Sequence, residues 1–141
     1  MVLKEYSYGI IPFQKFGNEW KVFLVQHGRA KYWGFPKGHA EGKESPKEAA
    51  SRELYEETRL KIVRYFSDTP NEEHYHYMLC GRYIDKTVYL FAAEVEGEVH
   101  LQKEEVSGGD WLPIKEAIHK LTYEIDKSAC QLAAEGVLGI L

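Results

Sequence analysis

Apolar and polar positions change their spacing from one segment of the chain to the next, and the change predicts both strands and helices. Apolar or alternating runs at 6–13 and 20–26 flank Gly17-Asn18 and predict two strands joined by a turn. Similar runs predict further strands at 33–36, 61–66, 74–79 and 86–95, and one that ends at Trp111-Leu112-Pro113. Helices are expected at about 46–58, 114–121 and 123–135. The pattern predicts an α/β protein and leaves the order of its strands open.

The start of the first predicted helix carries its own signal. Ser45-Pro46-Lys47-Glu48 reads as a capping box, in which the side chains of Ser45 and Glu48 each accept a hydrogen bond from a backbone N–H of the first turn. Pro46 suits the first helical position, where its missing N–H would have no partner. Small or apolar positions for packing are Ala49, Ala50, Leu54 and Leu60. We therefore expect this helix to begin at Pro46.

Charged residues gather on one side of the same helix. Four of them fall within six positions, namely Arg52, Glu53, Glu56 and Glu57. At about 100° per residue they lie within about 140° of one another. Three carboxylates that share a face repel, and a bound cation offsets the repulsion most directly. An acidic, solvated helix surface is the alternative interpretation, which the residues upstream of the helix disfavour.

The segment from Gly38 to Leu60 has a spacing that resembles a known motif. It reads Gly38, five residues, Glu44, seven residues, then Arg52-Glu53-Leu54-Tyr55-Glu56-Glu57. This resembles the Nudix box, and eight of the nine defined positions match across residues 38–60. The resemblance implies a single Nudix hydrolase domain over residues 1–141. It also implies an α/β/α sandwich with a mixed central sheet and a loop-helix-loop catalytic motif.

Arg59 is the one departure from the motif, because it stands where the family has glycine. A glycine that ends a helix usually adopts a left-handed conformation, which costs an ordinary residue about 1 kcal/mol or more. We therefore expect the helix to end differently in this chain. No metal ligand is lost at this position.

Size and charge narrow the class of protein further. The chain has 141 residues, 44% of them hydrophobic, and a net charge of −4, which suits one domain and disfavours broad binding to a nucleic-acid backbone. The start does not resemble a secretory signal, and no apolar run is long enough for a membrane span. Cys80 and Cys130 are too few for a disulfide framework. We expect buried, reduced thiols in a cytoplasmic protein without a membrane partner.

The same charge is compatible with a small phosphorylated substrate or the 5′ end of an RNA, provided that a few local cations hold the phosphates. Five lysines and arginines are candidates for this role: Arg29, Lys31, Lys37, Arg82 and Lys86. The oligomeric state does not follow from the sequence.

The Nudix resemblance implies hydrolysis of a phosphoanhydride bond at a divalent metal ion. Mg²⁺, with Mn²⁺ as an alternative, activates water and neutralises phosphoryl charge, and hard oxygen ligands hold it. Glu56 and Glu57 are the expected ligands, joined by the carbonyl of Gly38. Glu53 binds metal or orients the water, and Arg52 holds the carboxylates through its planar guanidinium. Which glutamate acts as general base stays open.

Two further acidic positions have two interpretations each. Glu44 anchors the loop before the helix or binds an outer metal ion. Glu105 resembles, in its distance before Trp111-Leu112, a family glutamate that reaches the metals and serves as base. The alternative is that Glu104 and Glu105 are solvated loop residues before Gly108-Gly109.

Segments outside the box resemble the asymmetric diadenosine tetraphosphate hydrolases of the Nudix superfamily. The matching segments are 32–39, 86–89, Trp111-Leu112 and the helix bearing Tyr123. The resemblance implies that Tyr32 and Tyr123 stack on adenine, where a ring contributes about 1–3 kcal/mol per base. It places Lys37, His39 and Lys86 near the phosphates. The alternatives are sheet or core positions for the tyrosines and a position flanking a strand for Lys86.

Residues 74–77, with the sequence His-Tyr-His-Tyr, form another pattern. Strand alternation puts His74 and His76 on one face and Tyr75 and Tyr77 on the other. Two histidines without a third ligand make a weak zinc site. We therefore predict a strand beside the substrate cleft, lined by Tyr77 or His76, with a purely structural role as the alternative.

The residues and the resemblance together favour one function. We expect an enzyme that hydrolyses dinucleoside polyphosphates with Mg²⁺, splitting diadenosine tetraphosphate into ATP and AMP by attack of water on phosphorus. The alternatives are an RNA 5′-pyrophosphohydrolase and a nucleoside triphosphate pyrophosphatase. A non-catalytic nucleotide sensor is disfavoured, because such proteins usually lose box glutamates, whereas Glu53, Glu56 and Glu57 are all present.

Overall fold

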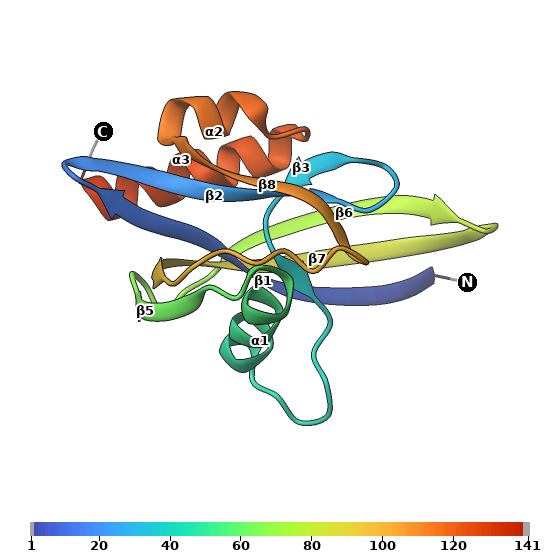
Figure 1. Ribbon diagram of the computed structural model, residues 1–141. Helices are drawn as coiled ribbons and strands as arrows, with labels where there is room; N and C mark the ends of the chain where they lie inside the picture. The colour runs from blue at the N-terminus through green and yellow to red at the C-terminus, as the bar shows by residue number, and fades with distance from the viewer. Residues whose placement is uncertain (1, 140–141) are drawn as a thin grey trace.

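The computed structural model describes residues 2–139, and within them the chain forms eight strands and three helices (Figure 1). The strands are β1 (Val2–Phe16), β2 (Glu19–His27), β3 (Tyr32–Gly34), β4 (Lys37–Gly38), β5 (Lys61–Tyr65), β6 (Asn71–Leu79), β7 (Arg82–Glu96) and β8 (Val106–Pro113). The helices are α1 (Pro46–Thr58), α2 (Ile114–Lys120) and α3 (Glu124–Leu138). Every predicted element is present, several strands extend beyond their predicted bounds, and the short β4 is an addition.

The strands form one mixed sheet. Along its main path the order is β3-β2-β1-β7-β5, with β4 beside β1, β6 beside β7 and β8 beside β2. β1 runs parallel to β7, and the other strand pairs are antiparallel. The parallel register brings Glu5 of the first strand beside Lys86. This long-range pairing confirms the mixed sheet and positions the N-terminal strand at the site described below.

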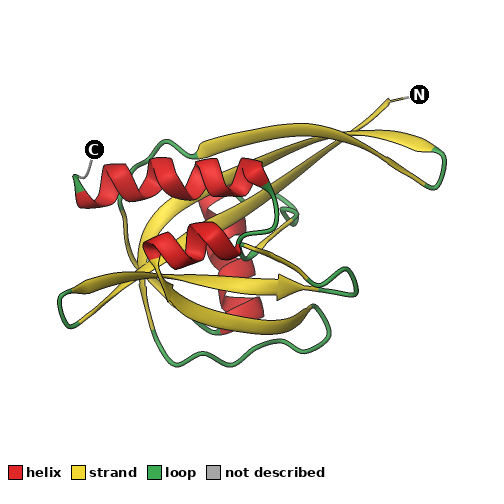
Figure 2. Ribbon diagram, turned by 90° about the horizontal axis from the view of Figure 1, so that it is seen from above, coloured by secondary structure: helices red, strands yellow, loops and turns green. Residues whose placement is uncertain are grey.

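Helices cover both faces of the sheet, with α1 on one face and α2 and α3 on the other (Figure 1 and Figure 2). Neighbouring residues of β1 divide between the two cores: Ile10 packs with α1, and Ile11 packs with α2 and α3. Phe23 and Leu24 of β2 divide in the same way. Because both faces of the central strands are apolar, both need a helical cover. The predicted α/β/α sandwich is confirmed. Separately, no helix in the described chain is long and apolar enough to cross a membrane.

Helix α1 begins as predicted and ends differently from the prediction. Ser45 accepts the Glu48 N–H at 3.1 Å, and its own N–H donates to the Glu48 carboxylate at 2.8 Å. At the other end, Arg59 adopts the left-handed conformation with φ 69°, and its N–H donates to the Tyr55 carbonyl at 2.8 Å. The expectation of a different helix end is therefore wrong. The Arg59 guanidinium lies 4.8 Å from the centroid of the Tyr55 ring, a contact that offsets part of the conformational cost.

The two cysteines occupy different environments. Cys130 lies on α3 and is buried in the core between this helix and the sheet, and burial raises the pKa of its thiol to about 12. Cys80 is exposed in the turn between β6 and β7. The expectation of two buried thiols is wrong for Cys80, because the turn of a hairpin lies beyond both cores.

Candidate active site

The charged side of α1 faces the short strand β4. Pairing with β1 sets Gly38 opposite Tyr8. Gly38 lies so close to α1 that a Cβ atom would stand 1.9 Å from Oε2 of Glu53. Glycine is therefore required at this position, and the backbone of residue 38 lies against the Glu53 carboxylate.

Arg52 holds the acidic side chains and the preceding loop together. Its Nε and Nη2 donate to the two carboxylate oxygens of Glu44 at 2.7 and 3.1 Å. Its Nη1 donates to Glu56 at 2.9 Å, and Nη2 also donates to the His39 carbonyl at 2.8 Å. Glu44 accepts the N–H of Glu41 at 2.8 Å, so it anchors the loop, which is one of the two roles considered for it. The hydrogen bond to Glu44 raises the pKa of Arg52, which therefore stays charged.

Glu53 and Glu57 are the buried members of the cluster, with exposed fractions of 8% and 1%. Burial raises the pKa of Glu53 to about 7, while Arg52 opposes the rise. Burial, followed by repulsion from Glu53 and Glu105, raises the pKa of Glu57 to about 9. Among residues 2–139, Oε1 of Glu57 has no hydrogen-bond partner. Buried acceptors crowded in this way match the oxygen donors that a divalent cation requires, so the residues fit the implied Mg²⁺ site.

The cluster borders a surface hollow of about 440 Å³. Glu105 reaches this hollow from the turn before β8, although it is distant in sequence from Glu53 and Glu56. The ring Nδ1 of His39 lies 3.0 Å from the Tyr6 carbonyl, which ties the loop to β1. The full lining is Ser7, His27, Tyr32, Lys37, Gly38, His39, Glu41, Arg52, Glu53, Glu56 and Glu105. The residues predicted for catalysis thus come together, with Glu57 buried next to them.

A second hollow, of about 610 Å³, adjoins the first because Tyr32 and Lys37 line both. The ring centroids of Tyr32 and Tyr123 lie 5.3 Å apart, and those of Tyr75 and Tyr77 lie 6.2 Å apart. The rest of its lining is Lys37, Glu73, Lys86, Ile125 and Asp126. Aromatic walls of this kind can stack on a flat base without selecting one type of base over another. We name this hollow the tyrosine pocket and the first one the glutamate hollow.

Lys86 and Tyr77 share an anchor in the tyrosine pocket. The Tyr77 hydroxyl donates to Oε1 of Glu5 at 2.9 Å, and the Lys86 Nζ lies 3.6 Å from the same oxygen. Lys86 is 8% exposed, and burial lowers the pKa of its ammonium, an effect that Glu5 opposes. Glu5 was not predicted, because its place here depends on the pairing of two strands that are far apart in the sequence.

A buried pair of carboxyl groups, Glu73 and Asp126, also lies in the wall of the tyrosine pocket and was not predicted. Their exposed fractions are 1% and 4%. Burial and the contact with Asp126 raise the pKa of Glu73, and Oε2 of Glu73 finds no hydrogen-bond partner in the part of the chain that the structure describes. A single proton held between the two carboxyl groups would reduce the repulsion between them, and we expect the pair to hold one. Strand alternation would have found Glu73, which shares a face with Tyr75 and Tyr77, whereas nothing in the sequence marks Asp126.

His27 supports the ring of Tyr32. The two rings are stacked, with centroids 4.9 Å apart and planes 25° apart. Nε2 of His27 lies 2.8 Å from the Phe35 carbonyl, to which the neutral ring donates. Burial lowers the pKa of His27 to about 4 and raises the pKa of Tyr32 to about 12, so both rings are neutral at pH 7. No sequence signal identified His27, because its role comes from packing alone.

Some residues proposed from the sequence lie outside both hollows. Arg29 and Lys31 are exposed between β2 and β3, and Arg82 begins β7 at the hairpin turn. None of the three lines the glutamate hollow or the tyrosine pocket. Of the two residues expected to line the cleft, Tyr77 does so and His76 does not, because adjacent residues of a strand face opposite sides.

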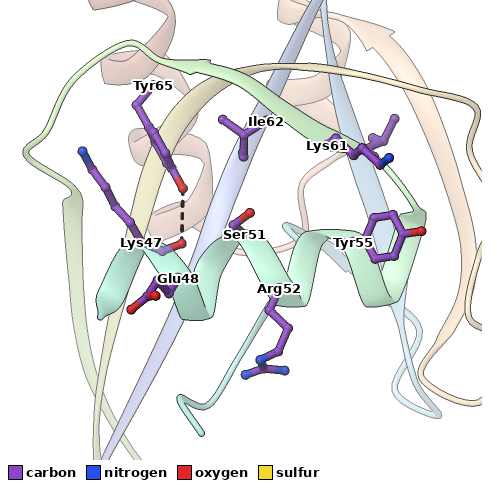
Figure 3. A pocket seen from close by; sticks show the side chains of 9 residues that line it. Lys47, Glu48, Ser51, Arg52, Tyr55, Lys61, Ile62 and Tyr65 are labelled. Carbon is purple, nitrogen blue, oxygen red and sulfur yellow. Dashed lines mark hydrogen bonds between the residues drawn. The ribbon is translucent and has the colours of Figure 1, made fainter. Parts of the chain in front are cut away.

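Another hollow, of about 630 Å³, lies between α1 and β5 (Figure 3). The Tyr65 hydroxyl donates to the Lys47 carbonyl at 3.2 Å across it. Figure 3 shows the Arg52 side chain pointing away from Tyr65, so its guanidinium leaves this space. Glu48 is the one acidic residue in the lining, and its carboxylate is engaged in the capping box. Although this hollow is larger, the groups that support phosphate chemistry are in the glutamate hollow.

Comparison with known proteins identifies relatives that match most of the length of this chain. The NUDIX domain family matches residues 4–132. The RNA pyrophosphohydrolase of Bartonella tribocorum is 29% identical over 104 residues, which cover 64% of this chain and 60% of that protein. The RNA pyrophosphohydrolase of Rhizobium meliloti is 30% identical over 103 residues, which cover 64% and 62%. The chain thus spans about three fifths of the length of these curated relatives.

Solved structures share the fold over nearly the whole chain. A binary complex of the C. elegans Ap4A hydrolase superimposes with a TM-score of 0.73 at 23% identity, covering 95% of this chain and 98% of that one. The NUDIX domain of Shewanella oneidensis NrtR, complexed with ADP ribose, gives a TM-score of 0.70 at 17% identity and covers 98% and 89%. At these identities the likeness shows a shared fold and does not extend to the substrate.

Proposed function

Because the chain belongs to the NUDIX family, we propose that it is a hydrolase of dinucleoside polyphosphates that cleaves diadenosine tetraphosphate into ATP and AMP. One observation carries the proposal: Tyr32 and Lys37 line both the tyrosine pocket and the glutamate hollow. A base stacked in the tyrosine pocket therefore has its phosphate chain directed past Lys37 toward the glutamates. That sequence of aromatic, cationic and acidic surfaces suits a flat base followed by a long polyphosphate.

The proposed reaction adds water across one phosphoanhydride bond. The water oxygen bonds to the phosphorus that carries one adenosine, and the bond from that phosphorus to the bridging oxygen breaks. AMP keeps the new oxygen, and ATP leaves with the bridging oxygen. Mg²⁺, when bound, lowers the pKa of water and neutralises phosphate charge. Glu53, Glu56 and Glu57 would hold it together with the Gly38 carbonyl.

The remaining residues position the substrate and accept the proton. Tyr32 and Tyr123 supply stacking faces, while Lys37 and Lys86 neutralise phosphate oxygens that metal does not reach. His39 borders the glutamate hollow, where phosphates would pass. Glu53 and Glu105 both line that hollow and are the candidates for accepting a proton from water. The cytoplasm, where nucleotides and Mg²⁺ are available, is the proposed location.

Removal of pyrophosphate from the 5′ end of RNA is the second candidate function. The observation in its favour is that curated relatives at about 30% identity are named RNA pyrophosphohydrolases. A triphosphate end would bring its first base to the tyrosine pocket in the same manner. The net charge of −4 disfavours it, because the chain beyond that base would meet little positive surface.

Parallel incubations in ¹⁸O-water with Mg²⁺ distinguish the two. The substrates are diadenosine tetraphosphate, a short triphosphorylated RNA and a nucleoside triphosphate, with products resolved by chromatography and mass spectrometry. We expect equal ATP and AMP, with ¹⁸O in AMP, and loss of both products in Glu57→Gln. Glu98→Gln, at a side chain that is 87% exposed, is the control and should match wild type.

Four outcomes would contradict parts of this proposal. ADP as the product would mean symmetric cleavage. Faster turnover of the triphosphorylated RNA would favour the second candidate, and faster turnover of the nucleoside triphosphate would favour a pyrophosphatase. Nucleotide binding without any turnover, in Mg²⁺ or Mn²⁺, would mean a sensor on a hydrolase scaffold.

A further inference from the structure

The hairpin of β6 and β7 carries a second cluster of ligand-type side chains, away from both hollows. The hairpin and the start of β1 extend beyond the helices at one end of the molecule (Figure 1 and Figure 2). His74 and His76 lie on one face of β6, and Asp85 lies on β7 in register with His76. Tyr77 and Lys86, the next residues along each strand, line the tyrosine pocket. The cluster therefore occupies the opposite face of the same two strands.

The three side chains converge on one point. One ligand atom from each lies within 4.8 Å of the other two. Nε2 of His76 lies 3.6 Å from Oδ1 of Asp85, and Nε2 of His74 forms a hydrogen bond with the same oxygen. In a tetrahedral site with bonds of about 2.0–2.2 Å, ligand atoms stand about 3.3–3.6 Å apart. The spacing between His76 and Asp85 already suits such a site, and a metal ion would take the place of the hydrogen bond between His74 and Asp85.

The surroundings of the cluster hold the ligands and leave them open to water. Tyr83 stacks on the His76 ring, with centroids 5.1 Å apart and planes 15° apart. The side chains of His74, His76 and Asp85 are 51%, 43% and 21% exposed. Lys4 of β1 pairs with Asp85 of β7, so a positively charged residue also lies beside the cluster.

Two imidazoles and a carboxylate are ligands for Zn²⁺ and similar transition metals, whereas Mg²⁺ prefers oxygen ligands alone. We propose that His74, His76 and Asp85 form a Zn²⁺-type site with water as the fourth ligand, separate from the glutamate hollow. The metal would join β6 to β7 directly behind Tyr77 and Lys86. It would thereby brace the two strands that form one wall of the tyrosine pocket.

Isothermal titration calorimetry with Zn²⁺ tests the site in the full chain. Excess Mg²⁺ in the buffer occupies oxygen-only ligands, and a Glu57→Gln background weakens the glutamate hollow as a competing site. We expect one Zn²⁺ per chain at the hairpin. His76→Gln and Asp85→Asn should each weaken its binding at least about tenfold, since even the loss of a supporting group around a metal costs about 10–100-fold. Lys4→Gln should tighten it by removing a nearby positive charge.

Matched controls separate this site from other zinc-binding surfaces. His100 is an exposed histidine that lies 3.5 Å from Glu98, so His100→Gln removes a comparable histidine–carboxylate pair and should change nothing. Visible absorption of bound Co²⁺ gives a second readout, because imidazole ligands in a tetrahedral site produce stronger bands than six oxygens do. Circular dichroism checks that each variant is folded.

Zinc affinity and stoichiometry that stay at wild-type values in both His76→Gln and Asp85→Asn would overturn the proposal. Co²⁺ bands that persist in those variants would overturn it equally. Hydrolysis with Mg²⁺ should be normal in both, because the cluster faces away from the two hollows. The outcome is therefore independent of which nucleotide the enzyme cleaves.

Discussion

The molecule buries carboxyl groups in two places and stabilises them by different means. Glu53 and Glu57 lie beneath the glutamate hollow, while Glu73 and Asp126 lie in the wall of the tyrosine pocket. Burial is the largest cause of a raised pKa at both sites. The first pair has Arg52 beside it and opens toward solvent. The second pair has no arginine in contact within the described chain, and we expect a proton held between its two carboxyl groups to take the place of a cation.

The difference teaches that the surroundings of an acidic cluster decide what it can bind. Acceptors that lack donors and face an open hollow suit a metal ion. Acceptors enclosed by tyrosines suit a carboxyl pair that holds one proton between its two members, because such a pair carries one negative charge instead of two. Two ionised carboxylates in that pocket would repel more strongly the phosphates that Lys37 and Lys86 are placed to hold. The tyrosine pocket can therefore contain two acids and still accept an anionic ligand.

The largest expected effect is that of Glu57→Gln, which removes a ligand from the metal-type cluster. We expect turnover to fall by about 10²–10⁴-fold, because metal placement and proton transfer both depend on this group. Without metal, stability should not fall, since a neutral amide replaces a buried acid. Mg²⁺ should raise the unfolding temperature of wild type and not of the variant. A variant that Mg²⁺ still stabilises fully would mean that Glu57 is not a ligand.

The Glu57→Gln substitution should also change how the unfolding free energy of the metal-free protein depends on pH. The pKa of Glu57 rises from 4.5 to about 9 on folding, so folded protein holds the proton more tightly. The proton on Glu57 therefore contributes to the free energy of unfolding. This contribution is complete below about pH 4.5 and is lost as the pH rises toward 9, and each unit of the pKa difference corresponds to about 1.4 kcal/mol. Urea unfolding across this range should show a flatter dependence in Glu57→Gln. Equal slopes would contradict the raised pKa.

Arg52→Lys keeps the positive charge of the glutamate cluster and removes the planar fork. Because one Lys cannot reproduce the bonds to Glu44, Glu56 and the His39 carbonyl, we expect a loss of about 2–3 kcal/mol in unfolding free energy. Turnover should fall as well, because the loop and the carboxylates lose their common anchor. Arg64→Lys is the control: Arg64 pairs with Glu94 but is 62% exposed, so its loss should be below about 1 kcal/mol.

Tyr123→Ala tests the aromatic side of the tyrosine pocket. Loss of a stacking face worth about 1–3 kcal/mol should raise KM by about 5–150-fold and leave the folded state intact, since Tyr123 is 49% exposed. Tyr123→Phe should behave like wild type. Tyr83→Ala is a matched control, because Tyr83 is 41% exposed and does not line the pocket. An equal rise in KM in both alanine variants would exclude a specific stacking role.

Asp126→Asn changes the proton-sharing pair without removing a hydrogen-bond donor. The amide N–H can donate to Glu73 in place of the shared proton, so we expect a stability change below about 1.5 kcal/mol. Asp126→Leu leaves Glu73 without a donor and should cost about 1–3 kcal/mol, with a smaller loss at high pH because ionised Glu73 no longer meets the negative charge of Asp126. Urea unfolding of both variants at two pH values measures these losses in stability. Equal losses in the two variants would contradict proton sharing.

Arg59→Gly should have the smallest effect, within about 1 kcal/mol, although it restores the family residue beside the glutamate cluster. Glycine relieves the left-handed backbone, but it loses the contact with Tyr55 and gains freedom in the unfolded chain. Arg59→Ala keeps the backbone strain and loses the contact, so it should be the less stable of the two. Thermal unfolding compares the two variants, and an alanine variant more stable than the glycine one would mean that the backbone strain is smaller than the entropic cost of glycine.

Local signals in the sequence predicted the glutamate hollow better than the tyrosine pocket. Glu53 and Glu56 are one helical turn apart, Arg52 adjoins them, and a capping box fixes where that helix begins, so short-range spacing was sufficient. The tyrosine pocket is lined by residues of β3, β4, β6, β7 and the start of α3, and Glu5 of β1 contacts two of them. Tyr32 and Tyr123 were found through resemblance, whereas Glu5 and Asp126 had no signal. At Arg59 a local rule gave the wrong prediction. The rule expects glycine in the left-handed conformation at a helix end, whereas Arg59 adopts that conformation and has a favourable contact with Tyr55.

The sequence by itself determined the α/β class, the helix from Pro46 to Thr58 and the acidic face that this helix presents, because these depend on the period of the backbone and on neighbouring side chains. Tertiary structure alone decided which partners those groups meet. The parallel pairing of β1 with β7 set Glu5 beside Lys86, and the register of β6 with β7 gave His74 and His76 their third neighbour, Asp85. Strand register depends on contacts along the entire sheet, and no short segment of sequence encodes it.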